Sequence, residues 1–578
     1  MRLVAALAAA TLLAACSRPP AGTLVLRVLD TAAGAPVPAR VELLDPQGGA
    51  WVPRQALALS FECIAAPLPG PLRRISVDDR IRNPHTGTTQ FYLDGAGSLA
   101  LPPGHYRVRA FKGIEYAVAE RAFEIAPGES LTLDLPLARW IDMPARGWYA
   151  ADDHLHITRR TAEDDQRIAT WMRAEDLHVA NLLQMGTVDQ FGVTPQHDFG
   201  AAGEYRLGDT LLLSGQEHPR SHFLGHTITL GADAAIDLRE SYIVYETFWR
   251  AALREHGLPG FAHWGIGPAR DGLAVDAPRG LVFFLEVLQF EMPHYDVWYE
   301  LLDLGIRLTP TAGTDFPCGN WSLPGRERFY TRLGAPPTRE GWLEGVRRGR
   351  TFVTNGPLLD FRIAGAAAGA EIGDTLELDG PARLVFRGAV RYDPARDDVQ
   401  QVELVENGQA VALPVERAAP GDLRFELEHE VEASAWYALR VSGDKLGEAP
   451  LAPPPSGVSR RLADRVTNFG EVMDTSAAYF ASRRWVRPSA AHSAPIYVDV
   501  RGSDPLAEWP RARRLAQESL ARLDALEARL ADERLEAQAI WDWVPYSDGV
   551  SADHLRRNRP ALLRAIAEAR ARYQALLR

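Results

Sequence analysis

Two histidines stand two positions apart in the stretch GWYAADDHLHIT, residues 147–158, directly behind a pair of aspartates. Residues i and i+2 of a β-strand point to the same face, so His154 and His156 can present two imidazoles to one metal ion. The same pattern also fits a strand that merely has polar neighbours. A metal site requires further imidazole or carboxylate ligands from other parts of the chain.

Four further candidate ligands lie beside or at the end of strand-like segments. Glu217 and His226 occur in SGQEHPRSHFLGHTITLG, His263 ends the apolar run of GFAHWG, and Asp315 ends LTPTAGTDF in a glycine-rich turn. Imidazole and carboxylate ligands without thiolate suit Zn²⁺, Mn²⁺ or Fe²⁺. The sequence therefore predicts a site for divalent transition metal.

The elements that must position these ligands alternate between strand and helix over residues 140–357. LHVANLL, TLLLSG and FLEVLQF are typical of strands, whereas TAEDDQRIATWMRAED and RESYIVYETFWRAALREHG are typical of helices. Such alternation indicates an α/β domain with a mainly parallel sheet, open or closed. Parallel α/β folds build their sites at the carboxyl ends of strands, where the candidate ligands fall.

Segments of period-two alternation, cut by Gly and Pro turns, flank this domain on both sides. They predict an N-terminal β-sandwich at residues 23–139 and a second β-sandwich at residues 358–450. Residues 451–504 are predicted as a return segment with one strand, and residues 505–578 as a helical hairpin. We expect one apolar face of the hairpin to pack against the body of the protein. That face carries Leu515, Leu520, Leu523, Leu526 and Leu530.

Residues 1–15 have the pattern of a signal peptide, with Arg2, a short apolar run and small residues before Cys16. The apolar run is too short to span a bilayer as a helix. Leu13-Ala14-Ala15-Cys16 resembles the bacterial lipobox, in which the cysteine is lipidated and begins the mature chain. By this resemblance Ser17 favours the outer membrane, facing the periplasm, with lipid at Cys16 as the anchor. A secreted or periplasmic soluble protein is the alternative.

The net charge of −12 argues against a nucleic-acid partner, which would require a basic stripe. A small-molecule substrate is the partner that we expect. Cys63 and Cys318 lie far apart in the chain. The sequence is compatible both with two separate buried thiols and with one disulfide between these cysteines.

Five motifs in a fixed order resemble the CehA/McbA metallohydrolases: RWIDMPARGWYAADDHLH, GHTITLG, GFAHWG, TAGTDF and GRTFVTNGP. That family is a branch of the PHP (polymerase and histidinol phosphatase) superfamily. The resemblance covers roughly residues 100–360 and implies a PHP-like distorted (β/α)7 barrel with metal at the strand ends. The whole chain is then an α/β barrel flanked by two β-sandwich domains and a C-terminal helical hairpin.

Carried over residue by residue, the resemblance implies that His154, His156 and Asp315 are ligands of a first metal. Glu217 would bridge this metal to a second one. Asp152 would orient an imidazole, a role that metal-bound histidines usually require.

The second metal would be held by His226 and His263 together with the bridging Glu217. Two positions depart from the superfamily pattern, because Met185 and Pro317 stand where ligands of a third metal are expected. We therefore expect one or two ions, either Zn, Mn or Fe.

The resemblance implies metal-assisted hydrolysis of an ester, carbamate or amide-type bond, in which the metal activates a water molecule. Asp315 or Asp153 is a candidate acceptor of the water's proton. Arg220, Arg328 and Tyr330 are candidates for stabilising the developing oxyanion, although the last two would also suit a purely structural role in a loop.

Two other functions stay open. One is phosphoester hydrolysis on the same barrel, and the other is a non-catalytic envelope binding protein with a vestigial metal site. Glu286, an acid within an apolar strand, is either buried with a partner or placed at the rim of the site.

Overall fold

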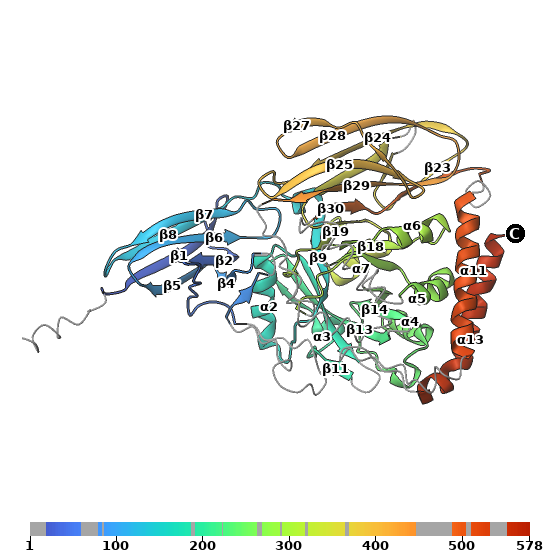
Figure 1. The fold of residues 1–578 in the computed structure, drawn as a ribbon, viewed down its shortest axis with the longest axis horizontal. Coiled ribbons are helices and arrows are strands. Elements are labelled where there is room, and N and C mark those ends of the chain that lie inside the picture. The colour runs from blue at the N-terminus through green and yellow to red at the C-terminus, as the bar shows by residue number, and fades with distance from the viewer. Residues whose placement is uncertain are drawn as a thin grey trace, which may run out of the picture.

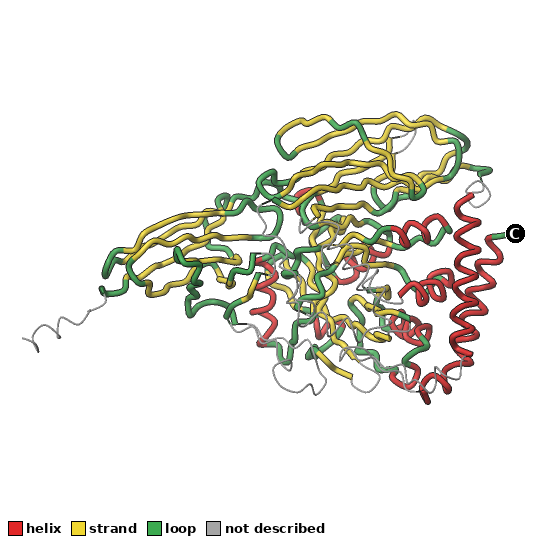
Figure 2. The backbone as a smooth tube through the Cα atoms, viewed as in Figure 1, coloured by secondary structure: helices red, strands yellow, loops and turns green. Residues whose placement is uncertain are grey.

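The computed structural model describes residues 19–58, 79–83, 86–186, 191–221, 224–262, 269–289, 292–317, 322–364, 369–446, 488–503, 510–531 and 552–578. Within these ranges the chain is mixed α/β, with more strand than helix and several sheets. Figures 1 and 2 show an all-strand part at the N-terminus (blue in Figure 1), a mixed central part, a second all-strand part above it and two long helices along one edge.

The N-terminal part is a sandwich of two sheets that enclose one core. Its strands are β1 (Gly22–Asp30), β2 (Pro38–Leu44), β3 (Ile81–Arg82), β4 (Thr89–Asp94), β5 (Ala96–Leu101), β6 (Gly104–Phe111), β7 (Ala119–Ile125) and β8 (Ser130–Leu137). They pair in the orders β5-β1-β8 and β3-β4-β2-β6-β7. Alternation along β1 turns Leu24, Leu26 and Val28 inward, where they are buried.

Buried polar contacts join this sandwich to helix α2 (Glu163–Ala174). Arg40 of β2 donates to the carboxylate of Glu175, just beyond the helix, at 2.7 Å. Lys112 donates from its Nζ to the carbonyl of Arg173, in the last turn of the helix, where the helix dipole favours a cation. Both basic side chains are buried, so the sandwich and the helix pack closely.

The central part contains twelve strands of one sheet. They are β9 (Trp148–Leu155), β10 (Val179–Gly186), β11 (Phe191–Val193), β12 (Tyr205–Leu207), β13 (Thr210–Ser221), β14 (Gly225–Leu230), β15 (Leu258–Phe261), β16 (Phe284–Gln289), β17 (Met292–Pro293), β18 (Thr309–Ala312), β19 (Arg328–Arg332) and β20 (Thr351–Thr354). Seven of them pair in the order β9-β10-β13-β14-β15-β16-β18. Beyond β18, Phe316 forms an isolated parallel bridge with Leu155 at the end of β9.

The sheet is mixed, so the expectation of a mainly parallel sheet holds only in part. β9, β10 and β13 are parallel to one another, as are β15, β16 and β18. β14, however, is antiparallel to both of its neighbours, and β19 is antiparallel to β9 and β20. The connection from β13 to β14 is short, and only antiparallel strands can be joined in that way.

Helices alternate with these strands and bury aromatic side chains against them. The helices after α2 are α3 (Gly200–Gly203), α4 (Tyr245–Arg254), α5 (Ala269–Asp276), α6 (Asp296–Asp303) and α7 (Arg339–Arg347). Trp249, Trp298 and Trp342, one each from α4, α6 and α7, are completely buried in the central core. This packing fixes the strand ends that carry the candidate ligands.

The second sandwich also consists of two sheets. Its strands are β21 (Leu358–Ala364), β22 (Gly369–Glu371), β23 (Thr375–Leu378), β24 (Ala382–Arg391), β25 (Asp397–Glu406), β26 (Gln409–Ala412), β27 (Glu416–Ala419), β28 (Asp422–Val431), β29 (Ala435–Lys445), β30 (Pro488–Ser493) and β31 (Ile496–Val500). One sheet has the order β22-β21-β24-β28-β27. In the other, β30 pairs with both β29 and β20, which makes this sheet continuous with the central one.

The strands β30 and β31 correct the predicted division of the chain. They lie in residues 451–504, which were predicted as a separate return segment with one strand, yet both pair with β29 of the sandwich. The junction is further held by Lys445 of β29, which is buried and donates to Asp397 at 2.6 Å and to the carbonyl of Asn355. The sandwich therefore takes its strands from two distant stretches of sequence.

Residues 505–578 contain two long helices, α11 (Pro510–Ala531) and α13 (Ala552–Leu576). They lie side by side along the edge of the central part, next to α5 (Figure 1). The predicted apolar face is buried at Leu515, Leu523, Leu526 and Leu530, all in the central core. Within the described residues, no helix combines the length and the apolar character that crossing a bilayer requires.

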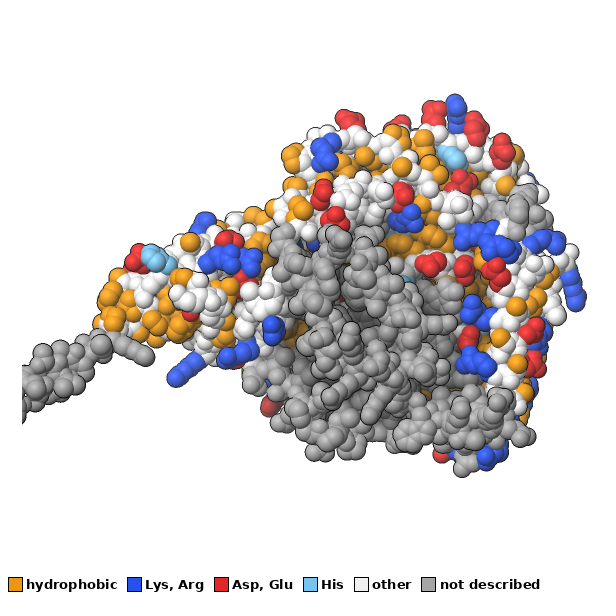
Figure 3. Space-filling view, viewed as in Figure 1, with side chains coloured by type: hydrophobic (Ala, Val, Ile, Leu, Met, Phe, Trp, Pro, Cys, Tyr) orange, Lys and Arg blue, Asp and Glu red, His pale blue; other side chains and the backbone are white. Residues whose placement is uncertain are grey.

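Figure 3 shows acidic and basic side chains intermingled along the upper surface of the second sandwich. The exposed ion pairs of the second sandwich include cross-strand pairs between β24 and β28, such as Arg387 with Glu426 at 2.8 Å and Arg383 with Glu428 at 3.1 Å. Exposed pairs of this kind add little stability.

Candidate metal centre

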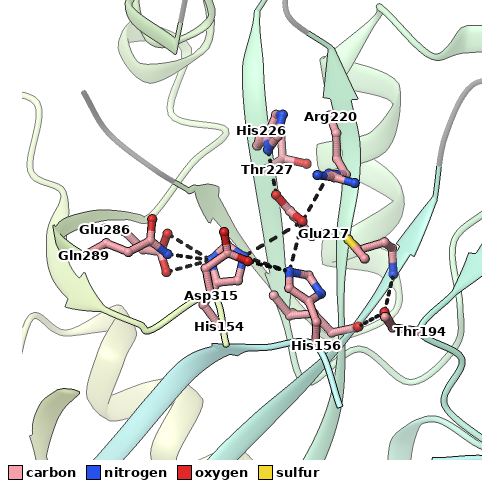
Figure 4. Close-up of polar contacts among 12 residues, drawn as sticks. His154, His156, Thr194, Glu217, Arg220, His226, Thr227, Glu286, Gln289 and Asp315 are labelled. Carbon is pink, nitrogen blue, oxygen red and sulfur yellow. Dashed lines mark hydrogen bonds and ion pairs between the residues drawn. The ribbon is translucent and has the colours of Figure 1, made fainter. Parts of the chain in front are cut away.

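Three of the predicted ligands meet in one buried cluster at the ends of β9 and β18 (Figure 4). The Nε2 atoms of His154 and His156 are 3.1 Å apart. Oδ1 of Asp315 lies 3.0 Å from Nε2 of His156 and 3.4 Å from Nε2 of His154. Both imidazoles are completely buried, and the Asp315 side chain is 12% exposed.

The backbone explains why these side chains converge. His154 lies in β9 and His156 directly follows that strand, so the two share a face as predicted. Asp315 follows β18 with a φ of 53°, in the left-handed region that aspartate tolerates better than most residues. The amide of His156 donates to the carbonyl of Phe316 at 2.8 Å, which ties the two strand ends together.

Gly313 provides the space for this convergence. A Cβ at this position would lie 2.6 Å from Oδ1 of Asp153 and 2.8 Å from Oε1 of Glu286, and it would also collide with Cβ of His154. Only glycine lets the end of β18 approach β9 so closely.

Glu217 of β13 reaches the same cluster from the neighbouring strand. Its Oε2 lies 3.3 Å from Nε2 of His156 and 3.9 Å from Nε2 of His154. Its Oε1 is 2.7 Å from Nδ1 of His226 on β14, and Oε2 is also 3.1 Å from Nε of Arg220 (Figure 4). The pairing of β13 with β14 is irregular between Glu217 and Arg220, which allows both side chains to face the cluster.

The ligand atoms of His154, His156 and Asp315 have the spacing of a metal coordination shell, and Glu217 lies beside the two histidines. Ligand atoms about 2.0–2.1 Å from a tetrahedral Zn²⁺ lie about 3.3 Å from one another. The spacings between the two Nε2 atoms and the oxygens of Asp315 and Glu217 range from 3.0 to 3.9 Å. The buried group of His154, His156 and Asp315 can therefore hold a metal ion.

The electrostatics of the cluster favour positive charge. Burial opposes protonation of His154, but the charges of Glu286 and Asp315 outweigh it and raise its pKa well above the ordinary value. Burial also opposes ionisation of Glu217, but Arg220 and His226 lower its pKa well below the usual range. A divalent cation would satisfy the same excess of negative charge.

His154 is oriented by a residue other than the one predicted. Its Nδ1 lies 3.0 and 3.1 Å from the two carboxylate oxygens of Glu286 and 3.2 Å from Nε2 of Gln289. The assignment of the orienting role to Asp152 was wrong, because that carboxylate accepts from the backbone amides of His154 and Gly325. Asp152 also accepts from the amide and the hydroxyl of Thr314, so it holds the loops around the site.

Asp153, a predicted proton acceptor, is completely buried beside the cluster. Its Oδ1 lies beside Gly313, on the same side as Glu286. Burial, and then the charge of Glu286, raise its pKa well above the usual value. Thr311 is its side-chain hydrogen-bond partner, so its contacts give no support to a role at a metal-bound water.

The structure does not bring Arg328 and Tyr330 to the site. Arg328 is buried and donates to the carbonyls of Gly325 and Glu175, at 2.5 and 3.0 Å. The Tyr330 hydroxyl donates to Glu115 at 2.8 Å, and its ring stacks on Phe352. Arg328 holds the loop that follows α2 and Tyr330 holds the junction with the N-terminal sandwich, so their assignment as oxyanion-stabilising groups was wrong.

Several predicted positions lie outside the described residues. They are His263, the third ligand of the second metal, and the cysteines Cys16, Cys63 and Cys318. Met185 and Pro317, which stand in place of third-metal ligands, are both described. Met185 is buried in β10, and its amide donates to the Thr194 hydroxyl at 3.3 Å.

No family model matches the chain, and no curated protein matches its sequence.

Proposed function

We propose that the protein is a metal-dependent hydrolase that cleaves an ester, carbamate or amide-type bond of a small substrate. The observation that carries the proposal is the convergence of two imidazole nitrogens, from His154 and His156, and one carboxylate oxygen, from Asp315, at coordination spacing, with Glu217 3.3 Å from His156. Completely buried ionisable groups at one point are costly, and a bound cation is the common reason for such an arrangement.

The arrangement of strands supports a PHP-like distorted barrel for the central part. Seven strands follow one another around the site, and the bridge between Leu155 and Phe316 links the last strand to the first. His154, His156 and Asp315 lie at the carboxyl ends of their strands, where α/β barrels carry their active sites. These features agree with the resemblance of the sequence motifs to the CehA/McbA metallohydrolases.

A divalent ion of Zn, Mn or Fe bound by these residues would supply Lewis acidity and lower the pKa of a bound water toward neutrality. The first ion would be held by His154, His156, Asp315 and Glu217. A second ion would use Glu217 and His226, with His263 as the remaining ligand. Whether the protein holds one ion or two is part of the proposal to be tested.

Asp315 is the carboxylate that we assign to accepting the proton of the attacking water. Its side chain is partly exposed, whereas the Glu217 side chain is completely buried and held by Arg220 and His226. Arg220 stands beside the metal cluster, and its guanidinium can stabilise an oxyanion that develops there. Binding of a neutral carbonyl substrate suits a site with one such cationic group.

Elemental analysis of the purified protein after loading with Zn²⁺ or Mn²⁺ tests the metal site. We expect at least one equivalent per chain for the wild type and loss of that equivalent in His154→Ala. Absence of bound metal in the wild type would refute the proposal.

A substrate panel then tests the reaction. We expect metal-dependent turnover of naphthyl esters or carbamates. Release of phosphate from p-nitrophenyl phosphates without ester turnover would assign a phosphoesterase instead. A loaded protein inert to the whole panel, and unchanged by His154→Ala, would favour the non-catalytic binding protein.

The envelope location is also a proposal. Labelling with a fatty-acid probe should mark the wild type but not Cys16→Ser. Secretion of an unlabelled wild type would favour a periplasmic soluble protein.

A further inference from the structure

Glu286 and Gln289 approach the same nitrogen of His154 from the same strand. In a regular strand, residues three apart point to opposite faces. The pairing of β16 with β18 is irregular between Glu286 and Leu288, and such an irregularity redirects the following side chains. As a result both side chains reach Nδ1 of His154, Glu286 at 3.0 and 3.1 Å and Gln289 at 3.2 Å (Figure 4).

The two partners favour opposite protonation states of the imidazole. A carboxylate can only accept, so Glu286 requires a proton on Nδ1 of His154. The amide nitrogen of Gln289 can only donate, so in the observed orientation it requires a bare Nδ1. A neutral imidazole carries one proton, and only the form with that proton on Nδ1 leaves Nε2 with a lone pair for a metal.

We infer that Glu286 is a positioning residue that selects the metal-binding tautomer of His154 against competition from Gln289. The hydrogen bond to the carboxylate is charge-assisted, and it is stronger than a bond from a neutral amide. Both oxygens of Glu286 lie within hydrogen-bond distance of Nδ1, and the side chains of Glu286 and His154 are completely buried, so water does not weaken the contact.

His156 differs from His154 in this respect. Among the described residues, its Nδ1 has no hydrogen-bond partner. The tautomer of His156 is therefore left to the metal, whereas Glu286 keeps a proton on Nδ1 of His154 and leaves Nε2 as the nitrogen available to a metal. The inference rests on the proposed metal site and identifies His154 as its pre-organised ligand.

Metal affinity, measured by competition with a chromophoric Zn²⁺ chelator, tests this assignment without any substrate. Glu286→Gln keeps the size of the side chain but removes the charge, and loss of such an outer partner typically weakens metal binding about 10- to 100-fold. Gln289→Leu removes the competitor, so its Zn²⁺ affinity should equal or exceed that of the wild type. Combining Gln289→Leu with Glu286→Gln should recover part of the loss.

The recovery separates tautomer selection from simple support of the fold, because two packing defects in contact would not restore affinity. The exposed Glu340, on α7, provides the matched control, and Glu340→Gln should bind Zn²⁺ as the wild type does. The visible spectrum of the Co²⁺-loaded protein should change in Glu286→Gln and remain as in the wild type in Gln289→Leu.

Affinity of Glu286→Gln within twofold of the wild type would overturn the inference, as would an equal loss in Gln289→Leu. Should Glu286→Gln fail to fold, Glu286→Asp replaces it, because its carboxylate is withdrawn by one methylene group and should weaken binding at least tenfold. An unchanged affinity in that variant would likewise overturn the inference. A wild type that binds no metal refutes the proposed function, whereas one that binds metal with this pattern but hydrolyses nothing refutes only the hydrolase.

Discussion

Replacing Gly313 with alanine should disable the metal centre through a single added methyl group. The new Cβ would lie 2.6 Å from Oδ1 of Asp153 and 2.8 Å from Oε1 of Glu286, and closer still to Cβ of His154. Ordinary contacts between such atoms require about 3.5 Å, so the end of β18 must withdraw from β9 by at least about 0.9 Å. Asp315 follows Gly313 by two residues and would move with it.

A displacement of this size exceeds the tolerance of about 0.5 Å within which a functional site must be held. We expect Gly313→Ala to weaken Zn²⁺ binding at least tenfold, as the loss of an orienting contact does. Gly334→Ala is the matched control, because no heavy atom lies within 4 Å of its added Cβ and its backbone is not in the left-handed region. Chelator competition measures both variants. Equal affinities for Gly313→Ala and the wild type would show that the strand ends are not as tightly fitted as we argue.

Three further changes test other parts of the structure. His156→Ala should abolish stoichiometric Zn²⁺ binding in elemental analysis. If the variant retained a full equivalent of Zn²⁺, His156 would not be a ligand of the metal. Tyr330→Phe should lower the free energy of unfolding by about 1–3 kcal/mol, because it loses the buried hydrogen bond to Glu115, and its Zn²⁺ affinity should not change. A changed Zn²⁺ affinity would show that Tyr330 does contribute to the metal site. Burial lowers the pKa of His492 from 6.5 to about 3. The neutral imidazole therefore contributes its full stabilisation above pH 6.5, and this contribution declines as the pH falls from 6.5 toward the lowered pKa. Between pH 7.5 and pH 5, the free energy of unfolding measured with denaturant should therefore fall by about 2 kcal/mol more in the wild type than in His492→Gln. Equal decreases in the two proteins would contradict the low pKa.

The metal ligands could be predicted because their signal is local. Two histidines at strand spacing and carboxylates or histidines at the ends of apolar runs each occupy a few adjacent residues. His154, His156, Glu217 and Asp315 were found in this way, and the structure brings all four together. His226 lies beside Glu217 as expected.

The partners of these ligands could not be predicted because they depend on pairing between distant strands. The role of Gln289 was missed, and that of Glu286 was left open, since the irregularity in β16 that aligns them leaves no mark in the sequence. Arg328 and Tyr330 were misassigned because their partners come from distant parts of the chain. Arg328 bonds to the backbone of Glu175, just beyond α2, and the pairing of β19 with β9 places Tyr330 where it reaches Glu115 of the N-terminal sandwich.

The fold shows the same limit. The N-terminal sandwich and the terminal hairpin were predictable from local periodicity, whereas the division after residue 450 was not. β30 enters the second sandwich only through its pairing with β29 and β20. Pairings between segments so far apart are decided by the packed structure.

The scarcity of lysine gives this protein an unusual chemical handle. Only Lys112 and Lys445 are present among 63 basic residues, and both ammonium groups are buried at junctions between parts of the chain. Arginine does not react with amine-directed acylating reagents. In the folded protein, acylation of Lys445 requires the second sandwich to separate from the central strands, and acylation of Lys112 requires the first to lift from α2. Mass spectrometry of the two acylated peptides would thus time the opening of each junction separately, in the unmodified wild-type chain.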